Sequence, residues 1–297
     1  MPHRTRLTLA APAPFELPLC LHGHGWVSLP PHRWDGGDAP WHVPLRLGRA
    51  LVSARVRQRE RRLAVELDSA RPLSPRAQDT ARAQLAHMLR LDDDLSAFWD
   101  ACAATPGLEW VARRGGGRLL RSATVFEDLM KLLFTTNCTW AATTAMTRNL
   151  VQAIGPEAPD GARAFPTAAE CDRGAAFYRD TVRAGYRSES CAMLAAAFAR
   201  GELDDAQFLD PAQPTDALRK RLLSLRGFGP YAAGQAMRLL GHYDDLALDS
   251  WCRAVLQRRQ GSRKPPADRT VARKFAPFGR HAGLALWCTL TADWHGE

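Results

Sequence analysis

Lysine is rare in this sequence of 297 residues, and long apolar runs are missing from it. Only four lysines stand beside 36 arginines, and they are Lys131, Lys220, Lys264 and Lys274. No window approaches the ~18 consecutive apolar residues of a membrane-spanning helix. Prolines and charges interrupt the first 19 residues, which excludes the apolar core of a secretory signal peptide. We therefore expect no interaction with a membrane.

Cysteine is present, but its spacing does not suit a metal. The seven cysteines are scattered, and no two of them are spaced as C-x-x-C. This excludes zinc ribbons and closely spaced iron–sulfur ligand runs. The nine histidines show no H-E-x-x-H pattern either, so we expect no catalytic metal. An odd, scattered set of cysteines is typical of reduced, buried thiols in the cytosol.

Arginine gives the chain an excess of positive charge. The 40 basic and 31 acidic residues leave a net charge of +9, and the fractions of hydrophobic (46%) and charged (24%) residues are those of a globular protein. Residues 251–297 alone carry nine Lys or Arg and three Asp or Glu. The planar arginine head is well matched to phosphate. A localised positive field suits a polyanion such as DNA, whereas the alternative is a basic surface that serves solubility.

The pattern of the first 115 residues differs from that of the rest. Ala50–Gln58 and Arg62–Asp68 alternate apolar and polar positions, which predicts two half-buried strands that pair as a hairpin. Pro75–Leu91 and Asp92–Ala103 are predicted to be helices. Arg113–Arg118 (RRGGGR) indicates a joint or tight turn, so we expect a domain boundary near it, with a small antiparallel-sheet domain over residues 1–115.

Helical periodicity dominates after residue 120 and predicts a mainly helical domain over residues 116–297. The fold class is therefore α+β. The expected helices begin at Ser/Thr caps or end at glycines, and they cover 122–134, 140–154, 188–200, 215–225, 231–240, 250–259 and 278–294.

The most informative segment is Leu222–Trp251, in which two short helices flank Gly227-Phe228-Gly229. Paired glycines allow the backbone of a turn to approach a partner closely. Their amides, beside a helix N-terminus, would form a main-chain site for a DNA phosphate. Pro230 has no amide to donate and fits the first turn of the second helix. An ordinary turn between two helices is the alternative.

The order of features in this segment resembles the helix-hairpin-helix and Gly/Pro-Asp motif of the HhH-GPD superfamily of DNA glycosylases. The matching features are an apolar helix, L-x-G-F-G, a small-residue helix and Asp249 about twenty residues later. Phe126–Ala141 and Gly185-Tyr186-Arg187 are similar to segments of the 8-oxoguanine branch, and Phe278–Trp294 resembles the last helix of bacterial relatives. The resemblance covers residues 115–297 well and the N-terminal part loosely. It implies a DNA-repair enzyme, a monomer of the bacterial cytosol or nucleoid, that acts on double-stranded DNA containing a damaged base.

Asp249 is the expected catalytic residue. The resemblance implies that its carboxylate faces C1′ of an extruded nucleotide, where it stabilises the oxocarbenium-like sugar and orients water. Asp249 also directly precedes a predicted helix, so its alternative role is that of an N-cap. The two roles are compatible.

Tyr231 stands where bifunctional members of the superfamily carry their Schiff-base lysine. We therefore expect a monofunctional enzyme that uses water and lacks AP-lyase activity. Only Cys252 and Cys288 follow the motif, so the four-cysteine cluster of the iron–sulfur branch is not expected. The resemblance allows a sodium or potassium ion at the hairpin.

The resemblance also suggests which residues contact DNA and the base. Asn137, in Thr135-Thr136-Asn137, matches the position that the 8-oxoguanine branch inserts toward the unpaired base, although a helix-breaking role is an equal alternative. The residues expected to bind DNA are Gly227, Phe228, Gly229, Asn137, Arg226, Arg280 and His281. A flipped base needs flat walls, for which the candidates are Phe134, Trp140, Tyr231, Trp251, Phe278 and Trp287.

Two substrate classes and two other functions are left open. Tyr231 and the surrounding aromatic residues favour a cationic alkylated purine such as 3-methyladenine. The T-T-N turn and G-Y-R favour an 8-oxoguanine-like lesion instead. A non-catalytic DNA-binding module would use the hairpin for phosphate contact alone. An arginine-rich RNA-binding protein is a further alternative, which no aromatic RNP-like strand motif supports.

Overall fold

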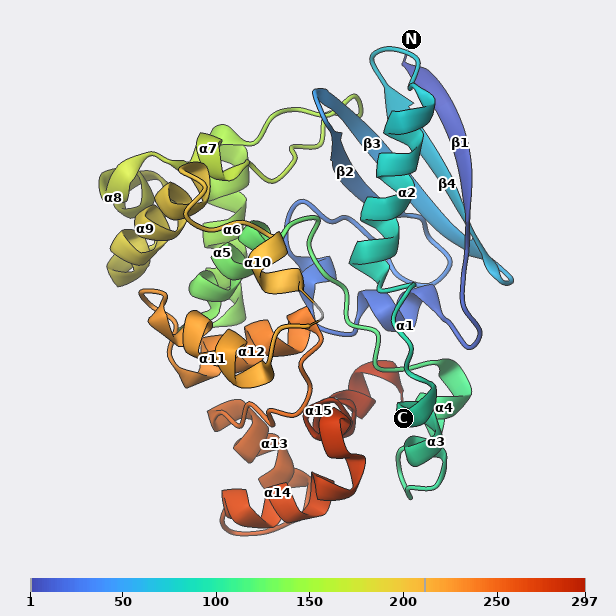
Figure 1. The fold of residues 1–297 in the computed structure, drawn as a ribbon, viewed down its shortest axis with the longest axis vertical. Helices are drawn as coiled ribbons and strands as arrows, with labels where there is room; N and C mark the ends of the chain where they lie inside the picture. Colours follow the sequence, from blue (N-terminus) through green and yellow to red (C-terminus); the bar gives the residue numbers. More distant parts are fainter. Residues whose placement is uncertain (1, 211, 297) are drawn as a thin grey trace.

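The computed structural model describes residues 2–210 and 212–296 and has an α+β architecture (Figure 1). One four-stranded antiparallel sheet has the order β1-β4-β3-β2. Its strands are β1 (His3–Ala10), β2 (Trp41–Leu47), β3 (Ala50–Arg59) and β4 (Arg62–Ser69). The predicted hairpin is confirmed, since β3 and β4 pair with Val56 opposite Val65.

Strands β1 and β2 were not predicted from the sequence. Pro44 lies inside β2, and proline cannot donate a ladder hydrogen bond. It is accommodated because β2 is an edge strand of the sheet. A proline is unusual in a strand, so the sequence pattern did not predict this edge strand, which is paired on one side only.

Helix α2 (Pro75–Leu89) packs against the sheet. Its first turn is capped by Ser74, whose side chain accepts a hydrogen bond from Ala77 N, and Pro75 is the first helical residue. Its buried residues Ala81, Leu85, Met88 and Leu89 recur at helical spacing. The apolar stripe that predicted this helix thus faces the sheet.

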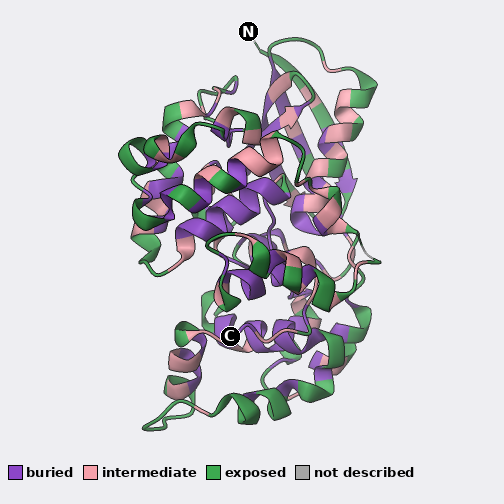
Figure 2. Ribbon diagram, turned by 60° about the vertical axis from the view of Figure 1, so that its left-hand side comes forward, coloured by how far each residue is buried: buried purple, intermediate pink, exposed green. Residues whose placement is uncertain are grey.

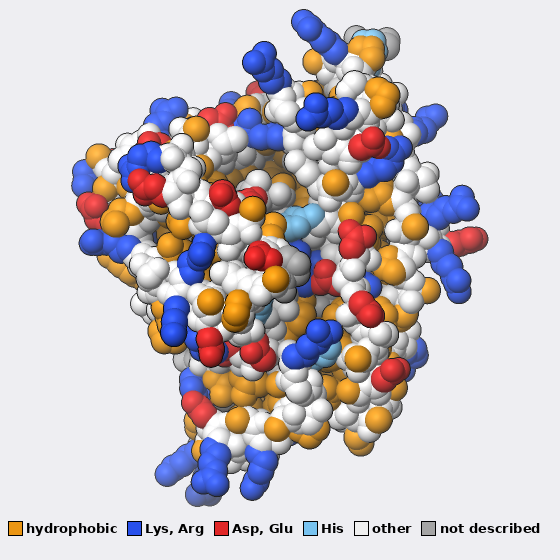
Figure 3. Space-filling model, viewed as in Figure 1, with side chains coloured by type: hydrophobic (Ala, Val, Ile, Leu, Met, Phe, Trp, Pro, Cys, Tyr) orange, Lys and Arg blue, Asp and Glu red, His pale blue; other side chains and the backbone are white. Residues whose placement is uncertain are grey.

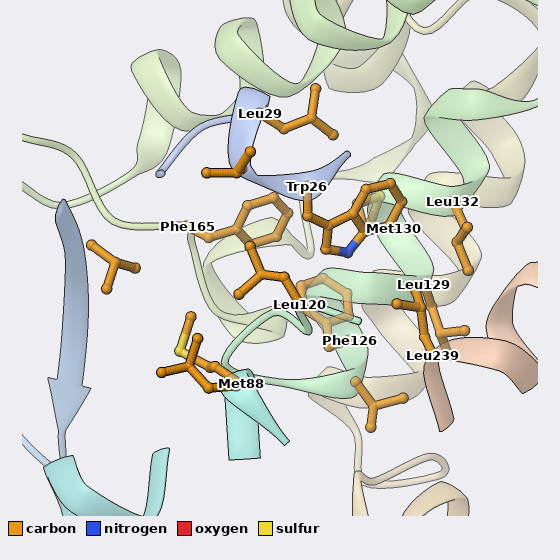
Figure 4. Packing of buried hydrophobic residues seen from close by; sticks show 14 of the residues in the cluster. Trp26, Leu29, Met88, Leu120, Phe126, Leu129, Met130, Leu132, Phe165 and Leu239 are labelled. Atoms are coloured by element: carbon orange, nitrogen blue, oxygen red, sulfur yellow. The ribbon is translucent and has the colours of Figure 1, made fainter. Parts of the chain in front are cut away.

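The middle of the chain forms an upper helical lobe that shares one hydrophobic core with the sheet (Figure 4). Short turns η2 (Tyr178–Val182) and η3 (Gly185–Arg187) interrupt it. Its helices are α5 (Val125–Thr135), α6 (Trp140–Ile154), α7 (Ala168–Cys171), α8 (Gly174–Phe177), α9 (Ser188–Ala199), α10 (Ala206–Leu209), α11 (Thr215–Ser224) and α12 (Pro230–Leu240).

A second core holds together a lower lobe made from two distant parts of the sequence. Helices α3 (Ser96–Ala103) and α4 (Glu109–Arg114) precede the upper lobe in the chain. Helices α13 (Ser250–Arg259), α14 (Asp268–Phe275) and α15 (Ala282–Thr291) follow it, with turns η4 (Ala276–His281) and η5 (Ala292–His295). Residues on both sides of the expected boundary near residue 115 therefore share this core.

The innermost helices are buried on most of their surface. Figure 2 shows long stretches of buried residues in the helices, and most residues of α5 and of α12 are buried. Helix α1 (Leu17–Leu21) and turn η1 (Trp26–Ser28) bring the N-terminal chain against these helices. Among residues 2–210 and 212–296, no helix has the length and apolar character needed to cross a bilayer.

The segment that joins α12 to α13 is held against α15 at a very short distance. Gly283 N donates a hydrogen bond of 2.6 Å to Tyr243 O. A Cβ at Gly283 would lie 2.0 Å from Asp245 O, so a larger residue would displace this segment. Because Asp249 ends the segment, this contact between backbones fixes where Asp249 stands relative to the lower lobe.

Helix α5 contains a fully buried ion pair. Lys131 Nζ donates to Glu127 Oε1 at 2.6 Å and to Ser122 Oγ at 3.2 Å. The Lys131 side chain is 0% exposed, and burial raises the pKa of Glu127. Removing one partner of such a pair is costly because the other charge is left buried without compensation.

We expect Lys131→Met to lower the free energy of unfolding by about 3–5 kcal/mol. The double variant Lys131→Met/Glu127→Leu, which removes both charges, should recover most of this loss. Urea denaturation followed by circular dichroism measures both values. A double variant as unstable as Lys131→Met alone would contradict the assignment of the loss to an unpaired carboxylate.

Candidate active site

A cavity of about 490 Å³ lies where the N-terminal chain, the upper lobe and the lower lobe meet. This is within the range of ~300–1,000 Å³ typical of small-molecule sites. Aromatic side chains from distant parts of the sequence form most of its walls. The lining residues are His22, His24, Gly25, Trp26, Ser28, Leu132, Thr135, Cys138, Trp140, Thr143, Tyr231, Gln235, Asp249, Trp251, Trp287 and Trp294.

Five tryptophans surround this cavity in two groups. Trp251, Trp287 and Trp294 lie together, with ring centroids 5.7–5.8 Å apart. Trp26 and Trp140 form a stacked pair at 6.4 Å. Each group combines a buried ring that is anchored by a hydrogen bond with one or more exposed rings. The cavity thus has fixed rear walls and an accessible aromatic rim.

Asp249 lies at the edge of the cavity and is half-buried. Its Oδ1 accepts a hydrogen bond of 2.6 Å from Cys252 N, so it is the N-cap of α13. No hydrogen bond to Oδ2 is present among the described residues. One oxygen is therefore held by the helix, and the other is available to a ligand.

A groove of about 540 Å³ adjoins the cavity and shares Asp249, Tyr231 and Trp251 with it. The turn between α11 and α12 supplies Gly227, Gly229 and Pro230 to this groove. The turn between α5 and α6 and turn η3, which belong to the same lobe, also line it, with Thr136, Asn137, Tyr186 and Arg187. Asp249 consequently stands at the junction of an aromatic cavity and an open groove.

The turn between α11 and α12 has the backbone geometry that its glycines predicted. Gly227 has φ +88°, and a Cβ there would meet Ser190 Oγ at 2.7 Å. Gly229 is exposed and caps α12, whose first residue is Pro230. Arg226 is exposed beside them. Backbone amides at this turn thus lie next to a helix N-terminus, as an anion site requires.

Hydrogen bonds join turn η3 to the turn between α5 and α6 beside the groove. The Arg187 guanidinium donates to Thr136 O and lies 4.4 Å from the centroid of the Tyr186 ring. Tyr186 is exposed and donates to Thr136 O at 3.2 Å. Asn137 is exposed with φ +45°, a backbone conformation that asparagine tolerates better than most residues. The T-T-N and G-Y-R segments therefore form one surface.

Tyr231 stands between cavity and groove, one helical turn before Gln235. Burial raises the pKa of its phenol, and the neighbouring Asp249 carboxylate adds to this effect. The phenol is thus protonated at neutral pH. Lysine is absent from the lining residues of both the cavity and the groove.

Gln235 forms part of the cavity wall, and Arg238 fixes its orientation. Arg238 is 1% exposed, lies 4.4 Å from the centroid of Trp287 and donates from Nη1 to Gln235 Oε1 at 2.8 Å. Because a guanidinium only donates, the oxygen of the amide must face Arg238. The amide nitrogen, Nε2, has no partner among the described residues and is left for the cavity.

Several predicted residues lie elsewhere. Phe134 is fully buried in the core of the upper lobe, and Phe278 packs against Phe98 in the core of the lower lobe, so neither lines the cavity. The Phe228 side chain is also buried, which leaves only its backbone near the groove. These three assignments are corrected: hydrophobic packing, and not base or DNA contact, uses these rings.

The last two predicted DNA contacts are separated from the groove. His281 is 7% exposed and packs between the rings of Phe98 and Tyr243. Arg280 is exposed, but it and His281 line a different hollow, together with Arg90 and Asp93. The structure thus brings together Asp249, Tyr231, Trp140, Trp251, Trp287, Asn137, Gly227 and Gly229, with Arg226 beside them.

Most of the lining residues were not predicted as site residues, among them His24, Trp26, Gln235 and Trp294. His24 and Trp26 come from the N-terminal chain, where the H-G-H-G-W run at residues 22–26 was the available signal. Gln235 and Trp294 lie within segments that were recognised, but without an assigned role. The fold brings the N-terminal run to the cavity through contacts more than a hundred residues apart in the sequence, such as the hydrogen bond between Trp26 and Asp128.

His24 is a neutral part of the wall. It contacts Trp26 edge-on at 4.5 Å, stacks on Trp287 at 5.5 Å and lies 3.3 Å from Gln235 Oε1 through Nε2. Burial, aided by the positive charge of Arg238, lowers the pKa of His24 to about 3. Because the unfolded chain binds this proton near pH 6.5 and the folded chain does not, stability falls as the pH drops from 6.5 toward 3.

We expect the free energy of unfolding to decrease by about 2 kcal/mol between neutral pH and pH 5 through His24 alone. His24→Phe keeps an aromatic ring without this proton, so its stability should depend less steeply on pH by that amount. Urea denaturation of both proteins between pH 5 and pH 8 measures the difference. Parallel pH profiles would contradict a neutral, buried imidazole.

Comparison with known proteins identifies the fold. No protein-family model matches the sequence, and no curated protein matches it. A 3-methyladenine DNA glycosylase from Archaeoglobus fulgidus is similar in structure, with a TM-score of 0.77 and 20% identity over 98% of this chain and 99% of that chain. MBOgg1, solved with a low-affinity DNA ligand, has a TM-score of 0.74 and 17% identity over 99% and 97%.

An 8-oxoguanine glycosylase/lyase from Clostridium acetobutylicum, solved with double-stranded DNA containing cytosine opposite 8-oxoG, has a TM-score of 0.67 and 14% identity over 100% of this chain and 99% of that chain. The matched length includes the N-terminal sheet, for which the sequence offered only a loose resemblance. The chain therefore has the fold of the 3-methyladenine and 8-oxoguanine DNA glycosylases, which is the fold that the resemblance implied.

Proposed function

We propose that the protein is a monofunctional DNA glycosylase that hydrolyses the N-glycosidic bond of an alkylated purine, such as 3-methyladenine, flipped out of duplex DNA. The position of Asp249 carries this proposal, because it joins an aromatic cavity that suits a base to a groove that suits a DNA backbone. The similar folds belong to enzymes named as glycosylases of alkylated and oxidised purines, which supports the same reaction class.

The proposed reaction uses a carboxylate and water and requires no metal. Cleavage of the N-glycosidic bond builds positive charge on the sugar, and a fixed anion next to C1′ stabilises that charge. Asp249 Oδ1 is held by Cys252 N, so Oδ2 is the oxygen that would face the sugar or orient the attacking water. The electron pair of the broken bond leaves with the base, and water supplies the hydroxyl group of the abasic sugar.

Hydrolysis without β-elimination follows from the absence of an amine. A lyase of this fold would need an amine to form a Schiff base with the sugar. Tyr231 cannot form one, and Lys131 is buried against Glu127. The other three lysines are not among the lining residues of the cavity or groove.

The walls favour a flat and positively charged base. Alkylation leaves purines such as 3-methyladenine cationic in the nucleotide, and tryptophan is the best π-surface for a cation. Trp140, Trp251 and Trp294 are exposed at the cavity and so have surface available for stacking. Each such contact is worth about 0.5–2 kcal/mol. An alkylated base also costs less to extrude when its pairing is weakened.

The direct test is incubation of the protein with duplexes that each carry one defined lesion, followed by alkali to cleave abasic sites. The proposal expects strand cleavage only after alkali, and most of it from duplexes with an alkylated purine. Cleavage before alkali would contradict the monofunctional mechanism. No base release from any duplex would contradict the enzymatic function.

We expect Asp249→Asn to lower the single-turnover rate of base release by about 10²–10³-fold or more. Asparagine is as good an N-cap as aspartate, so α13 and the stability of the protein should be preserved. Affinity for lesion-containing DNA should be retained, because only the charge is lost. A variant as active as the wild type would show that another group stabilises the sugar, whereas a non-catalytic binding module would have no base release to lose.

Within this proposal, Gln235 determines which edge of the base is accepted. Its Nε2 presents a hydrogen-bond donor to the cavity, because Arg238 holds its oxygen. Gln235 is 4% exposed and lies one turn deeper along α12 than Tyr231, so it would meet the edge of the purine that is farthest from the sugar. A donor there selects a base that carries an acceptor, such as a ring nitrogen, on that edge.

We expect base release to fall in the order wild type, Gln235→Met, Gln235→Glu. The methionine variant loses one hydrogen bond, which is worth about tenfold. The glutamate variant also places a hydrogen-bond acceptor against the acceptor of the base, so its rate of base release should fall further. Single-turnover rates measure the order, and unchanged affinity for a duplex with an abasic-site analogue, which has no base, is the control. A glutamate variant faster than the wild type would contradict the donor role.

Removal of 8-oxoguanine is the second candidate function, and one observation favours it. Asn137, Tyr186 and Arg187, which belong to the segments similar to the 8-oxoguanine branch, lie together on the groove. These residues would contact DNA around the lesion, whereas the aromatic cavity would contact the base itself. The same set of single-lesion duplexes distinguishes the two, because release of 8-oxoguanine in preference to alkylated purines would favour this alternative.

A further inference from the structure

Most of the net charge of the protein is concentrated in residues 253–274, which we call the distal basic surface. This stretch contains eight Lys or Arg and one acidic residue, Asp268. It comprises most of α13, the connecting loop and most of α14. Figure 3 shows Lys and Arg side chains gathered at the lower end of the molecule, where Figure 1 places these two helices.

Six of the eight cations are exposed and have no ion pair among the described residues. Arg253 pairs with Asp268, and Arg259 pairs with Asp293, each at 2.8 Å. The six without such a partner are Arg258, Arg263, Lys264, Arg269, Arg273 and Lys274. Like charges at this density repel one another, and a polyanion relieves the repulsion.

The surface is rigidly connected to the candidate active site. Val255, Leu256, Val271 and Phe275 are buried in the lower core and hold the two helices in place. Arg269 and Arg273 are four residues apart and therefore lie on the same face of α14. The cations thus project from a fixed framework. Phosphate contacts made by such rigidly held cations can set the register of a protein on a duplex.

Helix α13 connects the groove to the distal basic surface, and its length can be compared with the rise of a DNA duplex. Ser250 and Trp251, at the start of α13, line the groove beside Asp249. A helix of ten residues is about 15 Å long. For a duplex that runs along α13 from the groove, with a rise of about 3.4 Å per base pair, the far end of the helix would lie about four base pairs from the lesion. The same duplex can therefore reach both places.

We propose that the distal basic surface binds the phosphate backbone of undamaged duplex DNA on one flank of the lesion. It binds every sequence alike, because guanidinium and ammonium groups on phosphate carry no base information. Its role is to hold the protein on DNA during the search for a lesion, and it takes no part in base release. The inference therefore goes beyond the proposed reaction and does not require that the lesion be known.

The test is a matched pair of charge variants. The first is Arg263→Gln/Lys264→Gln/Arg269→Gln/Arg273→Gln, on the distal basic surface. The control is Arg57→Gln/Arg59→Gln/Arg61→Gln/Arg62→Gln, which removes the same charge from exposed residues around the turn between β3 and β4. Fluorescence anisotropy with an undamaged duplex, over a range of salt concentrations, measures affinity for both.

We expect the first variant to bind undamaged duplex at least about tenfold more weakly at low salt, with a salt slope reduced by up to about 4. The control variant should keep both the affinity and the slope of the wild type. Equal losses in the two variants would overturn the proposal, since net charge alone would then explain the binding. No loss in the first variant would overturn it as well.

Duplexes of different flank length locate the contact. With an abasic-site analogue in the duplex, the affinity of the wild type should rise once one flank exceeds about four base pairs, and the first variant should lack this gain. A gain that is the same in wild type and variant would overturn the proposal. Single-turnover base release at saturating DNA should be unchanged in the first variant, and a slower release would show that the surface belongs to the active site. Absence of base release in the wild type would contradict the proposed function alone, because the binding assays do not depend on it.

Discussion

The site depends on one hydrogen bond, from Cys252 N to Asp249 Oδ1, at 2.6 Å. This bond anchors the carboxylate to the first turn of α13 and satisfies one of the backbone amides that a helix N-terminus leaves unpaired. It also leaves the second oxygen to the junction of cavity and groove. Aspartate serves two roles at this position, because it is a good N-cap and because its carboxylate can stabilise the cationic sugar of the proposed reaction. The backbone contact between Gly283 and Tyr243 supports it, because it sets the path of the segment that ends at Asp249.

The two lobes explain why the cavity forms where it does. The chain enters the lower lobe at α3 and α4, crosses to the upper lobe and returns through the segment before Asp249. Each lobe has its own hydrophobic core, and the cavity lies between them, so Trp26 of one core and Trp287 of the other form part of its walls. Large aromatic rings line this boundary without closing it, because buried rings form the rear walls and exposed rings form the rim. Trp26 and Trp287 are held by hydrogen bonds to Asp128 and to Gly23 O; Trp140 stacks on Trp26, and Trp251 contacts Trp287 at a tilted angle.

Local pattern predicted most of the longer helices and the β3–β4 hairpin, whereas long-range packing decides which of their side chains line the cavity. Helix 250–259 and the hairpin turn follow from caps and turn chemistry, which are encoded within a few residues, whereas the role of Asp249 was implied by the resemblance and stays a prediction. Whether an aromatic ring lines a cavity depends instead on which elements pack around it. Phe134 and Trp140 lie six residues apart, yet the first is enclosed by the upper core and the second forms the rim of the cavity. His24 entered the site for the same reason, since only the tertiary fold brings it to Gln235, 211 residues away along the chain.

Charge is distributed along the cavity in a way that suits the proposed bond cleavage. Asp249 lines the cavity where the sugar would lie, and Arg238 is buried behind Gln235, with which it is paired. In the reaction, the sugar gains positive charge while the base takes the electron pair. Arg238 polarises the amide of Gln235 through its oxygen, which strengthens the donor that Nε2 presents to the leaving base. Burial keeps His24 neutral next to this pair, so no second cation competes for the amide oxygen. In the proposed reaction the aromatic walls hold the base, while the Asp249 carboxylate faces the positive charge that develops on the sugar.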